Sequence, residues 1–345
     1  MRRFWTDFFI GTFLLIFALV YSIKTIPASG GFDIEYSSYY LFDGERAEEY
    51  GIAKGTGYYD SRYYQQLTPN EQAIYDMTLN WTYNDEYIPL KLPNQVLFYS
   101  ADKKPTDFEL SGVRKFISNS YQRAIDALLM DNPQIFYLKM GDGGCVCNYE
   151  YRILSDDKEC LWVIDSLKLK LVVKDCYKGS VKEAVARLNK SCDFIPPGDT
   201  NYQKIKSIYN YIIKRGEYKE GENSDDAYGL LVEGEGVCSG FAKAFKLLCD
   251  KNNIPSTLVT GTGFTRKESG EHIWGLVQME DGLWYGVDPT WDDNGAGEYF
   301  LVGGETISSS SKYSFEQSHI PLGDFSSCGY KQFLYPAISD KKYYK

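Results

Sequence analysis

An apolar run with almost no polar residue extends from Phe8 to Ile23, just after Arg2 and Arg3. A basic start followed by an apolar run is the form of a signal peptide or signal anchor. A full membrane span takes about 20 residues, and this run is somewhat shorter. Because arginines before such a run stay in the cytoplasm, we expect everything after Lys24 to lie outside it. Residues 1–26 are therefore expected to be a signal peptide or, with a slight preference, a signal anchor, and the protein to be extracytoplasmic, either membrane-anchored by the N-terminal helix or secreted. A buried helix of a soluble protein is the disfavoured alternative, because the run lies at the extreme N-terminus.

Residues 27–65 are rich in Tyr, Gly, Ser and charge, show little periodicity, and are expected to form a spacer. Between residues 66 and 195 the chain switches between helical and alternating patterns. The predicted elements are a helix from the capping box Thr68-Pro69-Asn70-Glu71, a helix over 112–130, strands over 149–154 and 161–173, and a short helix from the capping box Ser180–Glu183. This order predicts a small α+β domain over 66–195.

Pro196-Pro197-Gly198 interrupts all periodicity and indicates a linker before a second domain over 199–345. The pattern there predicts helices followed by several strands. The predicted elements are a helix capped by Thr200, a helix over 239–251, strands over 256–261, 272–279 and 283–287, and a further strand over 299–302. Asp281-Gly282 indicates a hairpin between two of these strands. The fold class expected for the whole chain is α+β.

Net charge limits the classes of partner. The chain has 37 Lys and Arg against 47 Asp and Glu, a formal net charge of −10. Binding of nucleic acid needs a surplus of positive charge, so nucleic acid is not expected as a partner. The eight cysteines fit an exported protein in which some are paired. Cys249, on the apolar face of a predicted helix, is the expected unpaired one besides Cys238.

Cys238 lies in Gly236-Val237-Cys238-Ser239-Gly240, at the predicted first turn of a helix. Unpaired amides and the helix dipole at that position favour the thiolate form, and the same amides could hold an oxyanion. The flanking glycines let a substrate backbone approach closely. The alternative is an inert buried cysteine, which the glycine-rich helix start disfavours.

His272 and Asp288 are the second and third candidate residues. The hairpin centred near 281.5 places residue 272 opposite residue 291, so Asp288 is expected near the same end of the strand pair as His272. A carboxylate there would fix the imidazole tautomer and stabilise imidazolium. A lone structural histidine at the start of a strand is the alternative.

Three blocks in this order resemble the transglutaminase-like superfamily, with the likeness running from Tyr202 to about His319. The blocks are Ala227-Tyr228-Gly229-Leu230-Leu231 leading to Gly236–Ala242, then Gly270-Glu271-His272-Ile273-Trp274, then Tyr285-Gly286-Val287-Asp288-Pro289-Thr290-Trp291. The resemblance implies a papain-like arrangement in which the cysteine helix packs on an antiparallel sheet. It also implies Cys238 as nucleophile, His272 as general base and acid, and Asp288 as the orienting carboxylate. Residues 66–195 look similar to a segment that precedes this core in exported proteins of Gram-positive bacteria.

Members of the superfamily cross-link Gln to Lys, hydrolyse amides, cleave peptides or glycans, or have lost activity. We therefore expect a thiol-dependent acyl-transfer enzyme, a transamidase or a cysteine protease or amidase, acting on proteins or peptides, cell-wall peptide among them. The alternative is a catalytically silent cell-surface binding module that uses the same fold as a scaffold. Tyr228 and Trp274 are weak candidates for contacts with the oxyanion or substrate; packing is the commoner role of such residues. Asp292-Asp293-Asn294-Gly295 lacks the spacing of a calcium loop, and no metal or cofactor is expected.

Overall fold

The computed structural model describes residues 63–141, 143–156, 160–177, 180–266, 269–292, 297–309, 312–322 and 333–344. The expected signal peptide or anchor, and the spacer up to residue 62, lie outside these residues. None of the described helices has the length and apolar character needed to cross a membrane. Tyr63, Tyr64 and Gln65, which were predicted to end the spacer, instead begin the 3-10 helix η1 (Tyr63–Gln66), where Tyr63 is buried.

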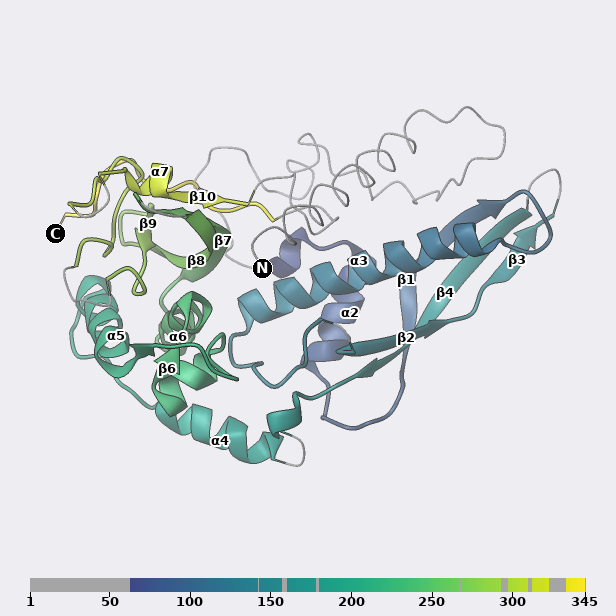
Figure 1. Ribbon diagram of the computed structural model, residues 1–345, viewed down its shortest axis with the longest axis horizontal. Helices are drawn as coiled ribbons and strands as arrows, with labels where there is room; N and C mark the ends of the chain where they lie inside the picture. The colour runs from purple at the N-terminus through teal and green to yellow at the C-terminus, as the bar shows by residue number, and fades with distance from the viewer. Residues whose placement is uncertain are drawn as a thin grey trace, which may run out of the picture.

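The first half of the described chain combines one long helix, α3, and two shorter helices, α2 and α4, with an antiparallel sheet (Figure 1). The central strand β4 pairs with β1 on one side and with β2 and β3 on the other. The elements are α2 (Pro69–Leu79), β1 (Ile88–Ser100), α3 (Asp107–Asp131), β2 (Cys145–Tyr149), β3 (Arg152–Ser155), β4 (Cys160–Leu171), the 3-10 helix η2 (Asp175–Tyr177) and α4 (Val181–Ser191). The expected α+β composition of this part is present.

Capping explains where these helices begin, and where the predictions were wrong. Thr68 caps α2 as expected: its side chain accepts from the Glu71 backbone amide, and the Glu71 side chain accepts from the Thr68 backbone amide. The next helix begins at Asp107 rather than 112, because Thr106 and Glu109 form a second capping box. Ser180 lies at the start of α4, but its side chain makes no capping hydrogen bond. The helix nevertheless extends to Ser191, beyond the predicted end near Leu188, because its apolar face packs into the core.

The second half places helix α6 against a four-stranded antiparallel sheet with strand order β10-β7-β8-β9, and helix α5 packs on α6. The elements are α5 (Asn201–Arg215), β5 (Glu217–Tyr218), the π-helix η3 (Gly229–Glu233), β6 (Glu235–Gly236), α6 (Cys238–Lys251), β7 (Ser256–Phe264), β8 (Ser269–Gln278), β9 (Trp284–Val287), α7 (Phe315–Ser318) and β10 (His319–Pro321). Helix α6 packs on β7 and β8. A helix that begins with the cysteine therefore lies on an antiparallel sheet. Residues 299–302 do not form the expected strand; Val302 makes only an isolated bridge to Gly286.

The two halves share buried contacts. One continuous cluster of buried side chains includes Ile125 and Leu128 of α3 together with Phe241 and Phe245 of α6. The Tyr63 hydroxyl donates a buried hydrogen bond to the backbone carbonyl of Leu258 in β7. Figure 1 shows the two sheets at opposite ends of the chain's described part, with these helices between them. The predicted division into domains at 195–199 stays a prediction.

Candidate active site

Cys238 is the first residue of α6, and its thiol is half-buried. The residue before it, Val237, has extended backbone angles (φ −97°, ψ −174°) and offers no side-chain cap. The first amides of the helix therefore lack a side-chain partner from Val237. The thiol packs against a small apolar cluster of Ala242, Leu258 and Ile273. The thiol thus lies between an apolar surface and the N-terminus of a helix. The partial positive charge of that N-terminus stabilises an anion at sulfur or at a substrate oxygen.

The loop before Cys238 is held tightly against the start of α6. Val237 N donates to the carbonyl of Ser224 at 2.8 Å. A Cβ added at Gly240 would collide with that same carbonyl. Glycine at 240 is thus needed for the close approach of loop and helix. The sequence argument assigned this glycine to substrate access, whereas the structure uses it to pack the 223–226 loop.

His272 reaches the site from strand β8, and Cys238 lies close enough to raise the pKa of its ring. Its Nε2 lies 2.7 Å from Asp288 Oδ2. Because Nε2 faces the carboxylate, Nδ1 is the ring nitrogen that remains for the thiol. The structure therefore brings Cys238, His272 and Asp288 together, as the sequence analysis expected.

The register of the hairpin differs by one residue from the expected one. Strands β8 and β9 pair Gly275 with Val287 and Gln278 with Trp284. This centres the turn on residue 281, so position 272 lies opposite 290, not 291. The turn holds three residues, 280–282, rather than the two expected, because Met279 N donates to Leu283 O and Gly282 N donates to Met279 O. Since β9 ends at Val287, Asp288 reaches His272 from the turn that follows the strand.

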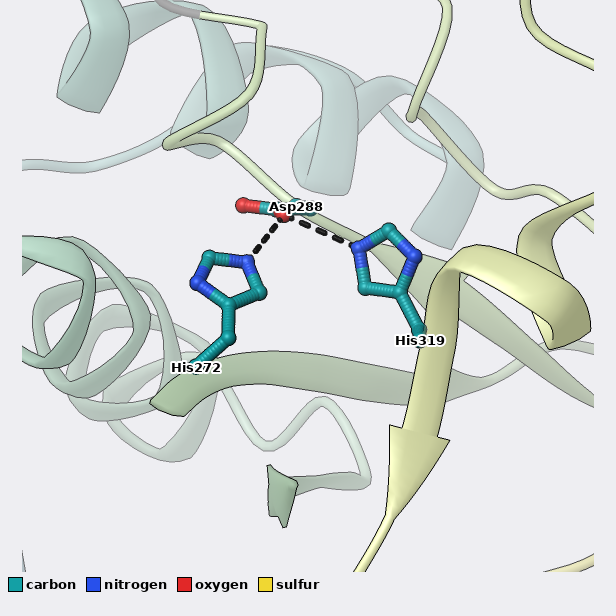
Figure 2. Close-up of side chains that lie close together, drawn as sticks. All are labelled: His272, Asp288 and His319. Carbon is teal, nitrogen blue, oxygen red and sulfur yellow. Dashed lines mark hydrogen bonds and ion pairs between the residues drawn. The ribbon is translucent and has the colours of Figure 1, made fainter. Parts of the chain in front are cut away.

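Asp288 is fully buried and accepts four hydrogen bonds. Its Oδ1 accepts from the backbone amides of Thr290 at 2.9 Å and Trp291 at 3.2 Å. Its Oδ2 accepts from His272 and, at 3.1 Å, from Nε2 of His319. An ionised carboxylate can only accept, so both Nε2 atoms carry a proton. Figure 2 shows the carboxylate between the two imidazoles, which come from different strands.

His319 is the residue that sequence reasoning missed. It begins β10, directly after α7, and its side chain is fully buried. Its Nδ1 lies 2.9 Å from the Ser318 hydroxyl. No local motif around His319 marks this role. The only available signal was that the chain has just two histidines, and that His319 lies at the end of the resemblance.

The carboxylate has opposite effects on the two imidazoles. Burial lowers the pKa of His272, but the charge of Asp288 and hydrogen bonds to Asp288 and Cys238 outweigh burial and raise the pKa to about 10. Burial also lowers the pKa of His319, and the contact with Asp288 does not overcome it, so this pKa stays below its ordinary value. For Asp288, burial raises the pKa, yet the charge of His272 and the bonds from both histidines hold it well below its usual range. The site therefore holds an imidazolium at 272, a carboxylate at 288 and a neutral imidazole at 319.

Aromatic rings enclose His272. Trp291 stacks on it with centroids 5.0 Å apart, and Trp274 lies 6.0 Å away in a similar plane. Trp291 covers the imidazole and also donates its backbone amide to Asp288. Trp274 is buried, and its ring also contacts His319 edge-on. Its placement fits packing around the two histidines.

Tyr228 lies in a different environment. Its ring stacks on Phe136 and meets Tyr177 edge-on, and the Arg187 guanidinium lies 5.7 Å from the ring centroid. These contacts join the two halves of the chain. A different tyrosine, Tyr218 on β5, is exposed; burial and then the charge of Cys238 raise its pKa.

Within the described residues, one group of His, Cys, Asp and Glu side chains has the spacing to hold a metal ion: His272, Asp288 and His319, with donor atoms within 4.8 Å of one another. A metal would need a lone pair on both Nε2 atoms, but both atoms carry protons that are bonded to Asp288. The arrangement therefore suits direct hydrogen bonding better than coordination. Asp292, from the acidic run 292–295, points inward and accepts from Tyr209, Glu298 and Tyr299.

The seven described cysteines are all free: Cys145, Cys147, Cys160, Cys176, Cys192, Cys238 and Cys249. The expectation that some cysteines are paired is therefore not met among the residues that the structure covers. Cys249 is fully buried, as its place on the apolar face of the helix predicted, and burial raises its pKa well above the ordinary value.

Cys238 begins a helix, His272 lies on the antiparallel sheet that this helix covers, and Asp288 directly follows the edge strand β9. Residues 192–289 match the family model of the transglutaminase-like superfamily. The matched segment contains Cys238, His272 and Asp288. A comparison with curated proteins finds no match.

Solved structures give distant similarities. A protein proposed as a cysteine protease from Cytophaga hutchinsonii is 16% identical, with a TM-score of 0.27, over 46% of this chain and 69% of that one. A structure described as a TGase is 14% identical, with a TM-score of 0.29, over 67% of this chain and 56% of that one. The periplasmic domain of TgpA from Pseudomonas aeruginosa, bound to ethylmercury, is 10% identical, with a TM-score of 0.24, over 59% and 75%. We draw no conclusion on activity from similarities this distant.

Proposed function

We propose that this chain is an extracytoplasmic thiol-dependent acyl-transfer enzyme that acts on amide bonds of proteins or peptides through a Cys238 thioester. The observation that carries the proposal is the placement of His272 between Asp288 and Cys238. Its Nε2 is 2.7 Å from Asp288 Oδ2, and Cys238 lies close enough to raise the pKa of its ring. A thiol, a proton carrier and a fixed carboxylate are the parts that nucleophilic catalysis at an amide requires.

The reaction would begin with attack of the Cys238 thiolate on the carbonyl carbon of the substrate amide. The carbonyl oxygen would take negative charge near the first amides of α6. His272, as imidazolium, would give its proton to the departing nitrogen as the carbon–nitrogen bond breaks. A thioester on Cys238 and a free amine result. Water or a second amine, deprotonated by the now neutral His272, would then attack the thioester and release the thiol.

The acceptor separates two outcomes of one mechanism. Water gives hydrolysis, as in a protease or amidase, whereas a lysine amine gives a cross-link. We propose protein or peptide substrates, cell-wall peptide among them. The exposed Tyr218 ring beside Cys238 offers an apolar surface with a hydroxyl for such a chain.

The test uses the full-length chain and its Cys238→Ala variant. Both are incubated with glutamine-containing protein substrates, with and without a fluorescent amine, and ammonia release, peptide cleavage and amine incorporation are measured. We expect at least one of these activities in the wild type and none in the variant. Amine incorporation identifies transfer; cleavage or ammonia release alone identifies hydrolysis. Equal signals from both proteins across the substrate panel would remove the enzyme proposal and favour a surface binding module.

We also propose that the folded part lies outside the cytoplasm, at the membrane through residues 1–26 or released. The support is the basic and apolar N-terminal sequence. Protease added to intact cells should digest the protein while a cytoplasmic marker survives. Full protection of the protein under those conditions would argue for a cytoplasmic location.

A further inference from the structure

Asp288 serves two imidazoles, although the proposed reaction uses one. His272 and His319 donate to the same oxygen, Oδ2, at 2.7 and 3.1 Å. The His319 side chain has no exposed surface, so it does not meet a substrate. Any effect of His319 on the reaction must therefore pass through the carboxylate.

We propose that His319 is a positioning residue: its hydrogen bond to Asp288 Oδ2 limits how strongly the carboxylate stabilises the imidazolium of His272. The inference rests on the proposed function, since it concerns the step in which that imidazolium releases its Nδ1 proton to the leaving amine, while its Nε2 proton stays on Asp288. If Asp288 interacted with His272 alone, its carboxylate would stabilise the imidazolium strongly and make it a poor acid. A second hydrogen-bond donor on the same oxygen weakens this stabilisation.

The fold gives His319 a defined place. It pairs with Gly263 across β10 and β7, while His272 pairs with Gly261 across β7 and β8. A Cβ at Gly261 would collide with the carbonyl of Ile320, next to His319. Gly261 thus lets β10 approach β7 closely, and Gly263 leaves room for the side chains of His272 and Trp291.

Ring packing fixes the orientation of His319 on the other side. Phe315 stacks on it with centroids 4.0 Å apart and planes 19° apart. Trp291 lies 4.4 Å away and Trp274 5.0 Å away, edge-on. Because His319 is neutral with its proton on Nε2, its Nδ1 accepts, and the hydroxyl of Ser318 is placed to donate. These contacts hold the donor toward Asp288.

Several other groups act on this cluster. Cys238 from α6 faces the His272 ring, and its charge and hydrogen bond favour the imidazolium. Asp292 adds negative charge near Asp288, and Tyr209 from α5 lies within hydrogen-bonding distance of both Asp292 Oδ2 and the Asp288 carbonyl. Besides burial, the charges of Cys238 and Asp288 raise the pKa of Tyr218 on β5. Among the described residues, His272 and Asp288 are the charged groups that act on His319. Variants at 319 leave all these groups in place.

The chain is well suited to a direct test, because it contains only two histidines. Full-length protein labelled with 15N-histidine would give signals from two imidazoles, and in a variant at 319 only the signals of His272 remain. Two variants form a matched pair. His319→Gln keeps an N–H donor near the position of Nε2, and His319→Leu keeps the approximate volume without a donor. Titration from pH 6 to pH 11 then gives the pKa of His272 in each protein.

We expect His319→Leu to raise the pKa of His272 by roughly half a unit to one unit and His319→Gln to leave it near the wild-type value. The kcat of the Leu variant should fall about tenfold with KM changed less than about twofold, and Gln should restore most of kcat. Thermal unfolding of each variant checks its fold. If the Leu variant does not fold, His319→Asn takes its place, because the shorter Asn amide does not reach Oδ2.

An unchanged or lowered pKa of His272 in the folded donor-free variant would overturn the role of His319. An equal loss of kcat in the Leu and Gln variants, without a shift in the pKa of His272, would also overturn this role. The titration needs no substrate, so it stands apart from the proposed function. If wild type and Cys238→Ala are equally inactive while the pKa shifts as expected, the proposed function fails and the link between His319 and His272 remains.

Discussion

Trp291 stacks on the imidazole of His272, with ring centroids 5.0 Å and planes 22° apart. The same residue donates its backbone amide to Asp288 Oδ1. One residue therefore orients both the proton carrier and the carboxylate that holds it. The two roles use different atoms, so a side-chain substitution separates them.

Replacing the Trp291 ring should loosen His272 without removing the amide bond to Asp288. We expect Trp291→Leu to lower kcat by about threefold to tenfold, because an aromatic contact of this kind contributes about 0.5–1.5 kcal/mol. Trp291→Phe keeps a ring over His272 and serves as the control. Steady-state kinetics on the substrate found for the wild type measures the difference. Equal losses in the two variants would show that stacking is not what matters.

Removing the charge of Asp288 should have the largest effect on the site after loss of the thiol. Asp288→Asn keeps the shape but cannot stabilise imidazolium, and its amide nitrogen cannot accept. We expect kcat to fall by about 10²–10⁴, the range found when an orienting carboxylate is neutralised. The pKa of His272, measured by NMR, should fall from about 10 toward 6.5. A variant with near wild-type kcat would contradict the role given to Asp288.

The raised pKa of His272 makes a pH-dependent contribution to stability. The folded value of about 10 exceeds the ordinary 6.5, so the folded state binds the proton more tightly than the unfolded chain. The contribution is complete below about pH 6.5 and is lost as the pH rises through about 10. Urea unfolding of wild type and His272→Phe from pH 6 to 10.5 should show the free-energy gap between them shrinking on the alkaline side. Both proteins have the same tyrosines, so the effect of tyrosine ionisation cancels in the difference between them. A difference in free energy of unfolding that stays constant with pH would refute this prediction.

The close approach of β10 to β7 should depend on glycine at 261. A Cβ there meets the backbone carbonyl of Ile320, which cannot move without displacing His319. We expect Gly261→Ala to lower the free energy of unfolding by about 1–3 kcal/mol. Gly270→Ala is the matched control on β8, because nothing lies within 4 Å of the added Cβ. Urea unfolding of both variants is the measurement, and a control as unstable as Gly261→Ala would point to strand propensity instead.

A buried ion pair away from the site should matter for folding. Arg123 Nη1 lies 2.7 Å from Glu71 Oε2, and both side chains are less than a tenth exposed. Arg123→Met leaves the Glu71 carboxylate buried without that partner, so we expect a loss of about 3–5 kcal/mol. Lys103→Met removes the exposed pair with Asp156 and should cost less than about 1 kcal/mol. Urea unfolding separates the two, and similar losses would contradict the difference drawn from burial.

Local signals in the sequence located much of the fold. The capping boxes at Thr68 and Thr200 mark real helix starts, because a cap satisfies amides within one turn. The box at Thr106 was overlooked, and the box expected at Ser180 does not form, since α4 is held by packing rather than by its cap. The hairpin at Asp281-Gly282 was found, but its register was off by one because the turn closes through backbone bonds that composition does not show.

By itself, the sequence predicted most of the helices and several strands, although it missed the long strand β1, and it singled out Cys238, His272 and Asp288, since each lies in a short segment whose neighbours fit its expected role. Only the tertiary structure decided what surrounds them. His319 reaches Asp288 from a strand 31 residues further on, where Gly261 on β7 leaves room for β10, and the Trp291 ring covers the imidazole. Such contacts depend on strand order and on how closely chains approach, which no local pattern encodes.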